Sequence, residues 1–211
     1  MISIQRLLGR PREFFGLLES SASLSMQSIA ELKAILARPD GPPDLTALRN
    51  ARRKGKEVMN RLEELLTRVF VTPIEREDLE ALGERLYRLP KTLEKFAERY
   101  EIVHDKVRGR DFSLLVGMLA RAASIVQEMV TRVGQGDNGA LAGVKALDAR
   151  LSQIEQEASH LILDATRQLY SAPAPALEAI VCKELNDILG DCIECCRDIG
   201  RTAALVILKN S

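Results

Sequence analysis

Carboxylate side chains recur at helical spacing near the end of the chain. Within the segment KELNDILGDCIECCRD (183–198), the acids at i, i+4, i+7 and i+11 fall on one helical face. They are Asp187, Asp191, Glu194 and Asp198. The opposite face is apolar, so the pattern predicts an amphipathic helix with an acidic stripe. Because like charges four residues apart repel, a cation, basic side chains on a neighbour or bulk water must offset them.

A hard cation is one way to offset these charges. Mg²⁺, Ca²⁺, Mn²⁺ and Fe³⁺ prefer several oxygen ligands, and a second predicted helix, over about 140–170, carries further acids on its polar side. If the two helices are antiparallel neighbours, the predicted metal ligands are Glu155, Glu157, Asp187, Asp191 and Glu194. The other interpretation is an exposed acidic face that is solvated or paired with lysines.

The two histidines allow a different metal chemistry. Each lies in a Glu-x-x-His motif, Glu101 with His104 and Glu157 with His160. Helical di-iron carboxylate proteins use two such motifs and a glutamate from each of two further helices. Candidates for these two glutamates are Glu64 and Glu128. A di-iron, ferritin-like oxidase or iron store is therefore the alternative function.

All four cysteines fall on the predicted helix over about 176–208, namely Cys182, Cys192, Cys195 and Cys196. One helix holds these side chains too rigidly for a disulfide framework, so we predict reduced thiols and a cytoplasmic protein. By spacing, Cys192 and Cys196 face the core as small apolar residues, whereas Cys195 leans toward the acidic face.

Composition narrows the classes of function. The 211 residues are 46% hydrophobic, and 30 basic residues balance 30 acidic ones. This neutrality, with only 4% aromatic residues, argues against nucleic-acid binding. The sequence has no apolar run of membrane-span length and no apolar signal core before Arg10, so we expect neither insertion nor export. It also has no glycine-rich phosphate loop or serine nucleophile motif, and we predict no enzymatic activity.

Six helices are needed to position these residues. Apolar periodicity between proline- and glycine-rich breaks predicts them over about 12–38, 45–70, 73–107, 111–133, 140–170 and 176–208. At the second break, Thr72, Pro73 and Glu75 predict a helix start with Thr72 as N-cap and Glu75 as its capping-box partner.

The six predicted helices form a duplicated unit within one domain, 1–211, with repeat one at about 12–108 and repeat two at about 111–210. A shift of about 103 residues superposes apolar positions, such as Leu82 on Leu185. The same shift sets bases of repeat one against acids of repeat two: Arg52 against Glu155, Arg88 against Asp191, Lys91 against Glu194 and Lys95 against Asp198.

The bases of repeat one have several possible partners. If the two repeats face each other, these bases could pair with the acids of repeat two and convert a metal site into an ion-pair network. The basic run from Arg49 to Lys56 could instead meet phosphate, an acidic partner or only solvent.

Three segments resemble the PhoU-like family of small helical proteins, often encoded beside inorganic phosphate permeases: FVTPIEREDLEAL (70–82), EQEA (155–158) and KELNDILGDCIECCRDIGRTAALVILKN (183–210). The likeness extends over nearly the whole chain. It implies an all-α fold, a six-helix bundle of two three-helix repeats, in a cytoplasmic, non-enzymatic regulator of phosphate transport. The implied partner is an inorganic phosphate permease or another transport regulator, through which the protein would associate peripherally with a membrane.

The resemblance also implies metal ions, divalent or ferric, held by acid-xxx-Asp pairs on two helices of each repeat. In repeat two, the pair Asp187 and Asp191 is intact, whereas Glu155 is followed by Ser159. The aligned pairs of repeat one are Arg52 with Lys56 and Glu84 with Arg88. We therefore expect one site to be lost and the other to be weakened. A generic helical adapter is the remaining possibility if neither metal nor transporter binds.

Overall fold

The computed structural model describes residues 11–38, 41–135, 141–171 and 175–210, and within them it contains helices and no strand. The helices are α2 (Pro11–Leu36), α3 (Thr46–Arg68), α4 (Arg76–Val103), η1 (His104–Lys106), α5 (Ser113–Gln135), α6 (Leu141–Ser171) and α7 (Ala176–Lys209). The prediction of six long helices is confirmed, and the short 3-10 turn η1 follows the end of α4.

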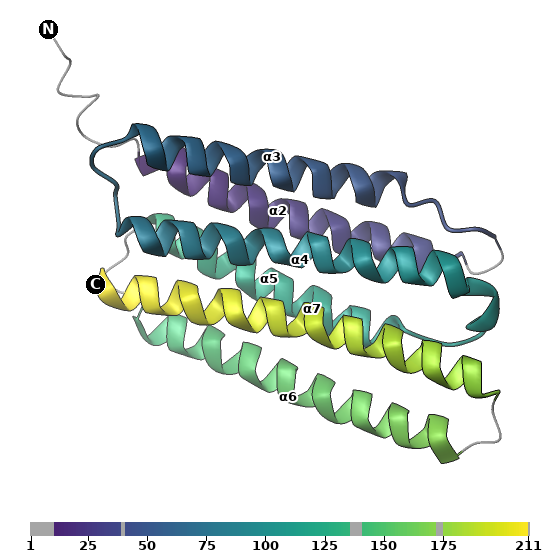
Figure 1. The fold of residues 1–211 in the computed structure, drawn as a ribbon. Coiled ribbons are helices and arrows are strands. Elements are labelled where there is room, and N and C mark those ends of the chain that lie inside the picture. Colours follow the sequence, from purple (N-terminus) through teal and green to yellow (C-terminus); the bar gives the residue numbers. More distant parts are fainter. Residues whose placement is uncertain (1–10, 39–40, 136–140, 172–174, 211) are drawn as a thin grey trace, which may run out of the picture.

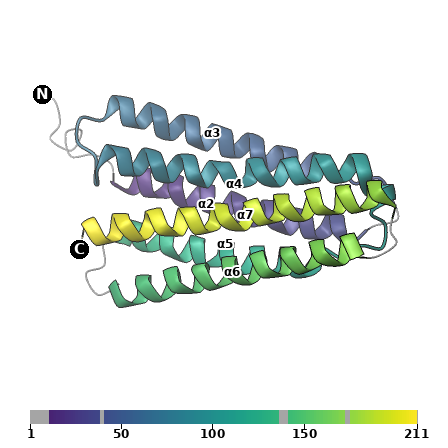
Figure 2. The same cartoon turned by 60° about the horizontal axis from the view of Figure 1, so that its bottom comes forward.

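The long helices form two layers. Helices α4 and α7 lie side by side, with α3 packed on the outer edge of α4 and α6 on the outer edge of α7 (Figures 1 and 2). Helices α2 and α5 cover one side of this row, α2 against α3 and α4, and α5 against α6 and α7. The arrangement of α2, α3 and α4 is thus repeated by α5, α6 and α7.

One continuous hydrophobic core joins the layers, and part of it lies at the seam between α4 and α7. Leucines recur at helical spacing along the buried side of α4, at positions 82, 86, 89 and 93. The buried residues of α7 include Leu185, Leu189, Cys192, Cys196 and Ile199, all at most 1% exposed. Burial on this scale is the main stabilising contribution to a helical bundle.

Two glycines of α7 set how closely α6 approaches. A Cβ atom built on Gly190 would lie 2.8 Å from Ile162 Cδ1 of α6, and one built on Gly200 would overlap Leu151 Cδ1. Since real side-chain contacts are not this short, a side chain at either position would force Ile162 or Leu151 to shift, so the two glycines favour the close approach of α6 to α7.

The beginnings of α3 and α5 use aspartate caps. The backbone N–H of Thr46 donates to Asp44 Oδ1 at 2.9 Å, and that of Ser113 donates to Asp111 Oδ1 at 2.7 Å. These hydrogen bonds lower the pKa of both carboxyl groups.

The predicted capping box at Thr72 is wrong. Helix α4 begins at Arg76, and residues 72–75 are non-helical. The Arg76 guanidinium donates to the backbone oxygens of Leu66 and Val69, which α3 leaves unpaired at its end. This tertiary contact holds the join in an open turn, so the local capping signal does not decide where α4 begins.

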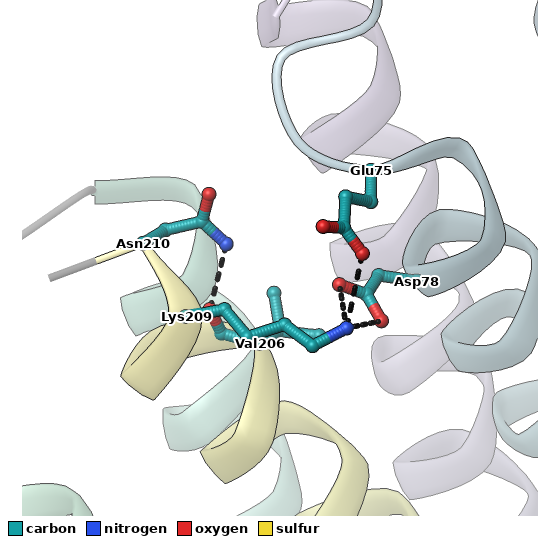
Figure 3. A network of polar contacts seen from close by, with 5 residues as sticks. All are labelled: Glu75, Asp78, Val206, Lys209 and Asn210. Atoms are coloured by element: carbon teal, nitrogen blue, oxygen red, sulfur yellow. Dashed lines mark hydrogen bonds and ion pairs between the residues drawn. The ribbon is translucent and has the colours of Figure 1, made fainter.

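The end of α7 is tied to the start of α4. Lys209 Nζ donates to Glu75 Oε2 at 3.0 Å and to both carboxylate oxygens of Asp78 at 3.1 Å (Figure 3). The carboxylates lie near the positive end of the α4 dipole and the ammonium near the negative end of the α7 dipole, so both are favourably placed.

Helix α5 requires a correction to the sequence prediction. By length and composition it is apolar enough to cross a membrane, although the sequence indicated no such run. Of its most apolar window, 56% is buried inside the bundle. The core helix of a bundle passes this test as readily as a membrane span, so the finding is weak support for a span.

Candidate functional site

An open groove runs between α6 and α7 and is lined by carboxylates. Glu155 comes from α6, and Asp187, Asp191 and Glu194 come from α7. We call this the acidic groove; its volume is about 700 Å³. Gly190 and Ile162 also line it, at a close approach of the two helices. Four of the five predicted metal ligands therefore share one groove.

The fifth predicted ligand, Glu157, lies outside the acidic groove. It follows Glu155 by two residues, a rotation of about 200° around a helix. Its carboxylate accepts a hydrogen bond of 2.8 Å from Gln153 Nε2 and lines a separate groove between α5 and α6, beside Arg121 and Arg150.

Two side chains of the acidic groove are already bonded to neighbours. The Lys183 ammonium forms an ion pair with Asp187, and this hydrogen bond raises the pKa of Lys183. The Ser159 hydroxyl donates to Glu155 Oε1 at 3.3 Å. Sequence reasoning missed Lys183 as a member of the site, although its spacing of i, i+4 from Asp187 is the usual signal for such a pair.

The donor chemistry of the acidic groove suits a hard cation, but its geometry is not that of a preformed site. Across the described ranges, no three His, Cys, Asp or Glu side chains are grouped closely enough to hold a metal ion. Asp191 and Glu194 are exposed and within the described residues have no ion-pair partner, whereas Asp187 is held by Lys183. A cation would have to compete with that lysine and draw the carboxylates together.

The expected ion-pair network between the repeats forms only in part. Asp198, the last acid of the α7 stripe, lies 3.7 Å from Arg88 Nη1 across the seam. Farther along the same seam, Arg99 Nε pairs with Glu184 at 3.1 Å. The bases of repeat one therefore do not neutralise the acidic groove itself.

A second groove lies between α3 and α4 and carries the opposite charge. It has a volume of about 530 Å³ and is lined by Arg52, Arg88, Lys91 and Lys95, with Thr92, Glu94 and Glu98. We call it the basic groove. The shift of about 103 residues that relates the repeats maps its four cations onto Glu155, Asp191, Glu194 and Asp198. The same position in the fold is therefore acidic in repeat two and basic in repeat one.

Most of the basic run from Arg49 to Lys56 lies outside this groove. Only Arg52 lines it, with its Nε 2.7 Å from Glu94 Oε2. Arg49 pairs with Glu101 at 3.3 Å and Arg53 with Glu57 at 2.8 Å, both at exposed positions where ion pairs contribute little.

The di-iron motifs are not brought together. The Glu101 carboxylate forms an ion pair with Arg49, and the Glu101 backbone oxygen lies 3.0 Å from His104 Nδ1. Glu157 and His160 lie on exposed positions of α6. The further candidates are also paired elsewhere, Glu64 with Arg68 and Glu128 with Arg132. No observation favours the ferritin-like alternative.

All four cysteines are free thiols and buried. The expectation that Cys195 leans toward the acidic face is wrong, because this residue is 2% exposed and its thiol lies near Thr92 of α4, inside the seam. Burial raises the pKa of each of the four thiols, most strongly at Cys192 and Cys196. The acidic groove therefore receives no sulfur ligand from them.

Comparison with solved structures shows the fold. The chain is similar to a PhoU-like protein from Shewanella oneidensis MR-1, with a TM-score of 0.74 and 15% sequence identity over 93% of this chain and 99% of that chain. A putative PhoU-like phosphate regulatory protein from the same organism gives a TM-score of 0.68 at 12% identity, with the same coverage. No family model and no curated protein matches the sequence. The predicted PhoU-like helical bundle is thus confirmed as the fold.

Proposed function

We propose that this chain is a non-enzymatic regulator of inorganic phosphate transport that acts in the cytoplasm. The observation that carries the proposal is the shared fold. The likeness extends over 93% of the chain, and one of the solved structures that share the fold is described as a putative phosphate regulatory protein. The segments FVTPIEREDLEAL and KELNDILGDCIECCRDIGRTAALVILKN support the same assignment by resemblance.

The layer formed by α3, α4, α7 and α6 is the proposed docking face. Helices α2 and α5 cover the other side of this row, so the acidic and basic grooves open away from them, one on each side of the α4–α7 seam. Exposed charges of both signs set the orientation and rate of association with a charged partner. The partner is the cytoplasmic side of an inorganic phosphate permease or another regulator of transport, so membrane association would be peripheral.

A divalent or ferric ion in the acidic groove would tune this contact. Asp191 and Glu194 would be its first ligands, because both are exposed, with Glu155 and Asp187 completing the set. Competition from Lys183 predicts weak binding. The test is calorimetric titration with Mn²⁺: the pair Asp191→Asn and Glu194→Gln should abolish binding. A matched charge control, Glu63→Gln and Glu80→Gln, removes two exposed acids elsewhere and should leave binding unchanged.

Co-purification and uptake test the regulatory role. A tagged chain expressed in its own host should retain a phosphate permease or a transport regulator from detergent-solubilised membranes. Deletion of the gene should change the rate of radiolabelled phosphate uptake. If deletion leaves uptake unchanged in both phosphate-rich and phosphate-poor medium, the role in transport is refuted.

One further titration separates the proposed regulator from a di-iron enzyme. Ferrous iron added in air should give no oxo-bridge absorbance. An absorbance that His160→Ala removes would overturn the non-enzymatic assignment in favour of di-iron chemistry.

A further inference from the structure

We propose that the basic groove between α3 and α4 binds a linear condensed phosphate, meaning a chain of three or more linked phosphate groups. Inorganic polyphosphate and the triphosphate of a nucleotide both belong to this class, and they share the chemistry that the groove recognises. The inference goes beyond the role in transport, because it rests on the charges of the groove alone.

The shape of the cation cluster favours an extended anion. Arg88, Lys91 and Lys95 occupy positions i, i+3 and i+7 of α4 and so follow one face of the helix. At about 1.5 Å per residue they span roughly 10 Å along the helix axis. Arg52 adds a fourth cation from the opposite wall, on α3. A single orthophosphate ion can contact only part of this row, whereas linked phosphate groups can follow it.

The cations are available to a ligand. Lys91 and Lys95 are exposed, and neither has an ion-pair partner within the described parts of the chain. The side chain of Arg88 is 57% exposed and lies 3.7 Å from Asp198, beyond hydrogen-bond distance. Ammonium and guanidinium groups form charge-assisted hydrogen bonds with phosphate oxygens, so each of the three can contribute one contact or more.

Arg52 is held in place but is not fully satisfied. Its Nε is buried and lies 2.7 Å from Glu94 Oε2, where it forms an ion pair but no hydrogen bond of good geometry. The Glu94 carboxylate therefore anchors the guanidinium without using all of its donors.

The balance of charge favours an anion over a cation. Four cations and two carboxylates, Glu94 and Glu98, line the basic groove, and Asp198 lies 3.7 Å from Arg88, which leaves a net charge of +1. The acidic groove has four carboxylates and Lys183, a net charge of −3. A polyanion is thus attracted to one groove and repelled by the other.

The test is calorimetric titration of the full chain with sodium tripolyphosphate in about 0.1 M salt. We expect saturable binding that weakens as salt is raised. The pair Lys91→Gln and Lys95→Gln should weaken binding by about tenfold or more, because two charge-assisted contacts are lost. The matched control, Lys54→Gln and Lys56→Gln, removes the same charge from exposed positions outside the groove and should change affinity by less than about twofold. Circular dichroism of both pairs checks that the helices are intact.

A gain-of-affinity variant strengthens the test. Glu98→Gln removes an acid from the groove and should tighten binding of tripolyphosphate. Equal affinities for tripolyphosphate and a nucleoside triphosphate identify the phosphate chain as the recognised part, whereas tighter nucleotide binding identifies a nucleotide as the ligand. Both outcomes support the proposal.

Three outcomes would overturn it. The first is that the wild-type chain shows no saturable binding of tripolyphosphate. The second is that the groove pair and the control pair of substitutions lower its affinity equally. The third is that orthophosphate and tripolyphosphate bind with equal affinity. None of these bears on co-purification with a permease, so the inference and the proposed transport role can fail separately.

Discussion

Gly200→Ala offers a sharp test of the packing that positions the acidic groove. Gly200 is buried on α7, where a Cβ atom would overlap Leu151 Cδ1 of α6 and lie 3.4 Å from Met129 Sδ of α5. The substitution therefore adds one methyl group where α6 and α5 meet α7. It should push α6 away from α7 and widen the groove that Glu155 and Asp191 line.

Two opposing contributions set the change in the free energy of unfolding caused by Gly200→Ala. Replacing glycine by alanine inside a helix stabilises by about 1 kcal/mol through backbone entropy. Overpacking a close-packed core destabilises by about 1–3 kcal/mol. Because Leu151 is 1% exposed and has little room to move, we expect the second effect to win, with a net loss of about 1 kcal/mol. For a chain of this size, that loss lowers Tm by about 2–4 °C.

Chemical and thermal unfolding, followed by circular dichroism, measure this change. The control is Gly117→Ala on α5, where an added Cβ would meet nothing within 4 Å. The free energy of unfolding of that variant should rise by up to about 1 kcal/mol. Leu151→Ala should lower the free energy of unfolding by about 1 kcal/mol less in the Gly200→Ala background than in the wild type. The reason is that Leu151→Ala removes the methyl group that the added Cβ atom at position 200 would crowd.

A stabilised Gly200→Ala variant would refute the reasoning. If Gly200→Ala raises the free energy of unfolding as much as Gly117→Ala does, α6 does not approach α7 closely at this position. Additive effects of the two substitutions at 151 and 200 would lead to the same conclusion.

Four further predictions concern charges and thiols. Burial raises the pKa of the thiols, so native protein at pH 8 should resist iodoacetamide until it unfolds, and mass spectrometry of the Cys192 peptide reports this. Since those thiols stay protonated in the fold but ionise in the unfolded chain, the free energy of unfolding should fall as pH rises above about 9, as urea titrations would show. Lys209→Met should lower the free energy of unfolding slightly by breaking the ion pair with Asp78, and 1 M NaCl should shrink that difference in urea titrations. Lys183→Gln should strengthen Mn²⁺ binding in the acidic groove by freeing Asp187, whereas unchanged affinity would exclude competition by the lysine.

The sequence predicts the helices because their signals are local. Apolar residues at helical spacing and breaks rich in proline and glycine depend on neighbouring residues only, and the ends of the helices fall within a few residues of the predicted ranges. The start of α4 is the exception. There the Arg76 side chain reaches α3, a contact that no local pattern contains.

The candidate site is predicted less completely, because a polar helical face does not reveal its neighbour. The carboxylates of α7 share a groove as their spacing predicts. On α6, however, one polar side faces α7 and another faces α5, which separates Glu155 from Glu157. The buried place of Cys195 likewise depends on α4 lying against α7, which the sequence of α7 alone does not show.

The opposite signs of the two grooves affect how whole molecules behave in solution. A chain with 30 basic and 30 acidic residues has no formal net charge, yet it carries an electric dipole across the α4–α7 seam. Such a molecule is retained by both cation- and anion-exchange resins near neutral pH. At low ionic strength the basic groove of one copy should attract the acidic groove of another. Salt at about 0.15 M shortens the screening length to about 8 Å and should therefore weaken this attraction between copies.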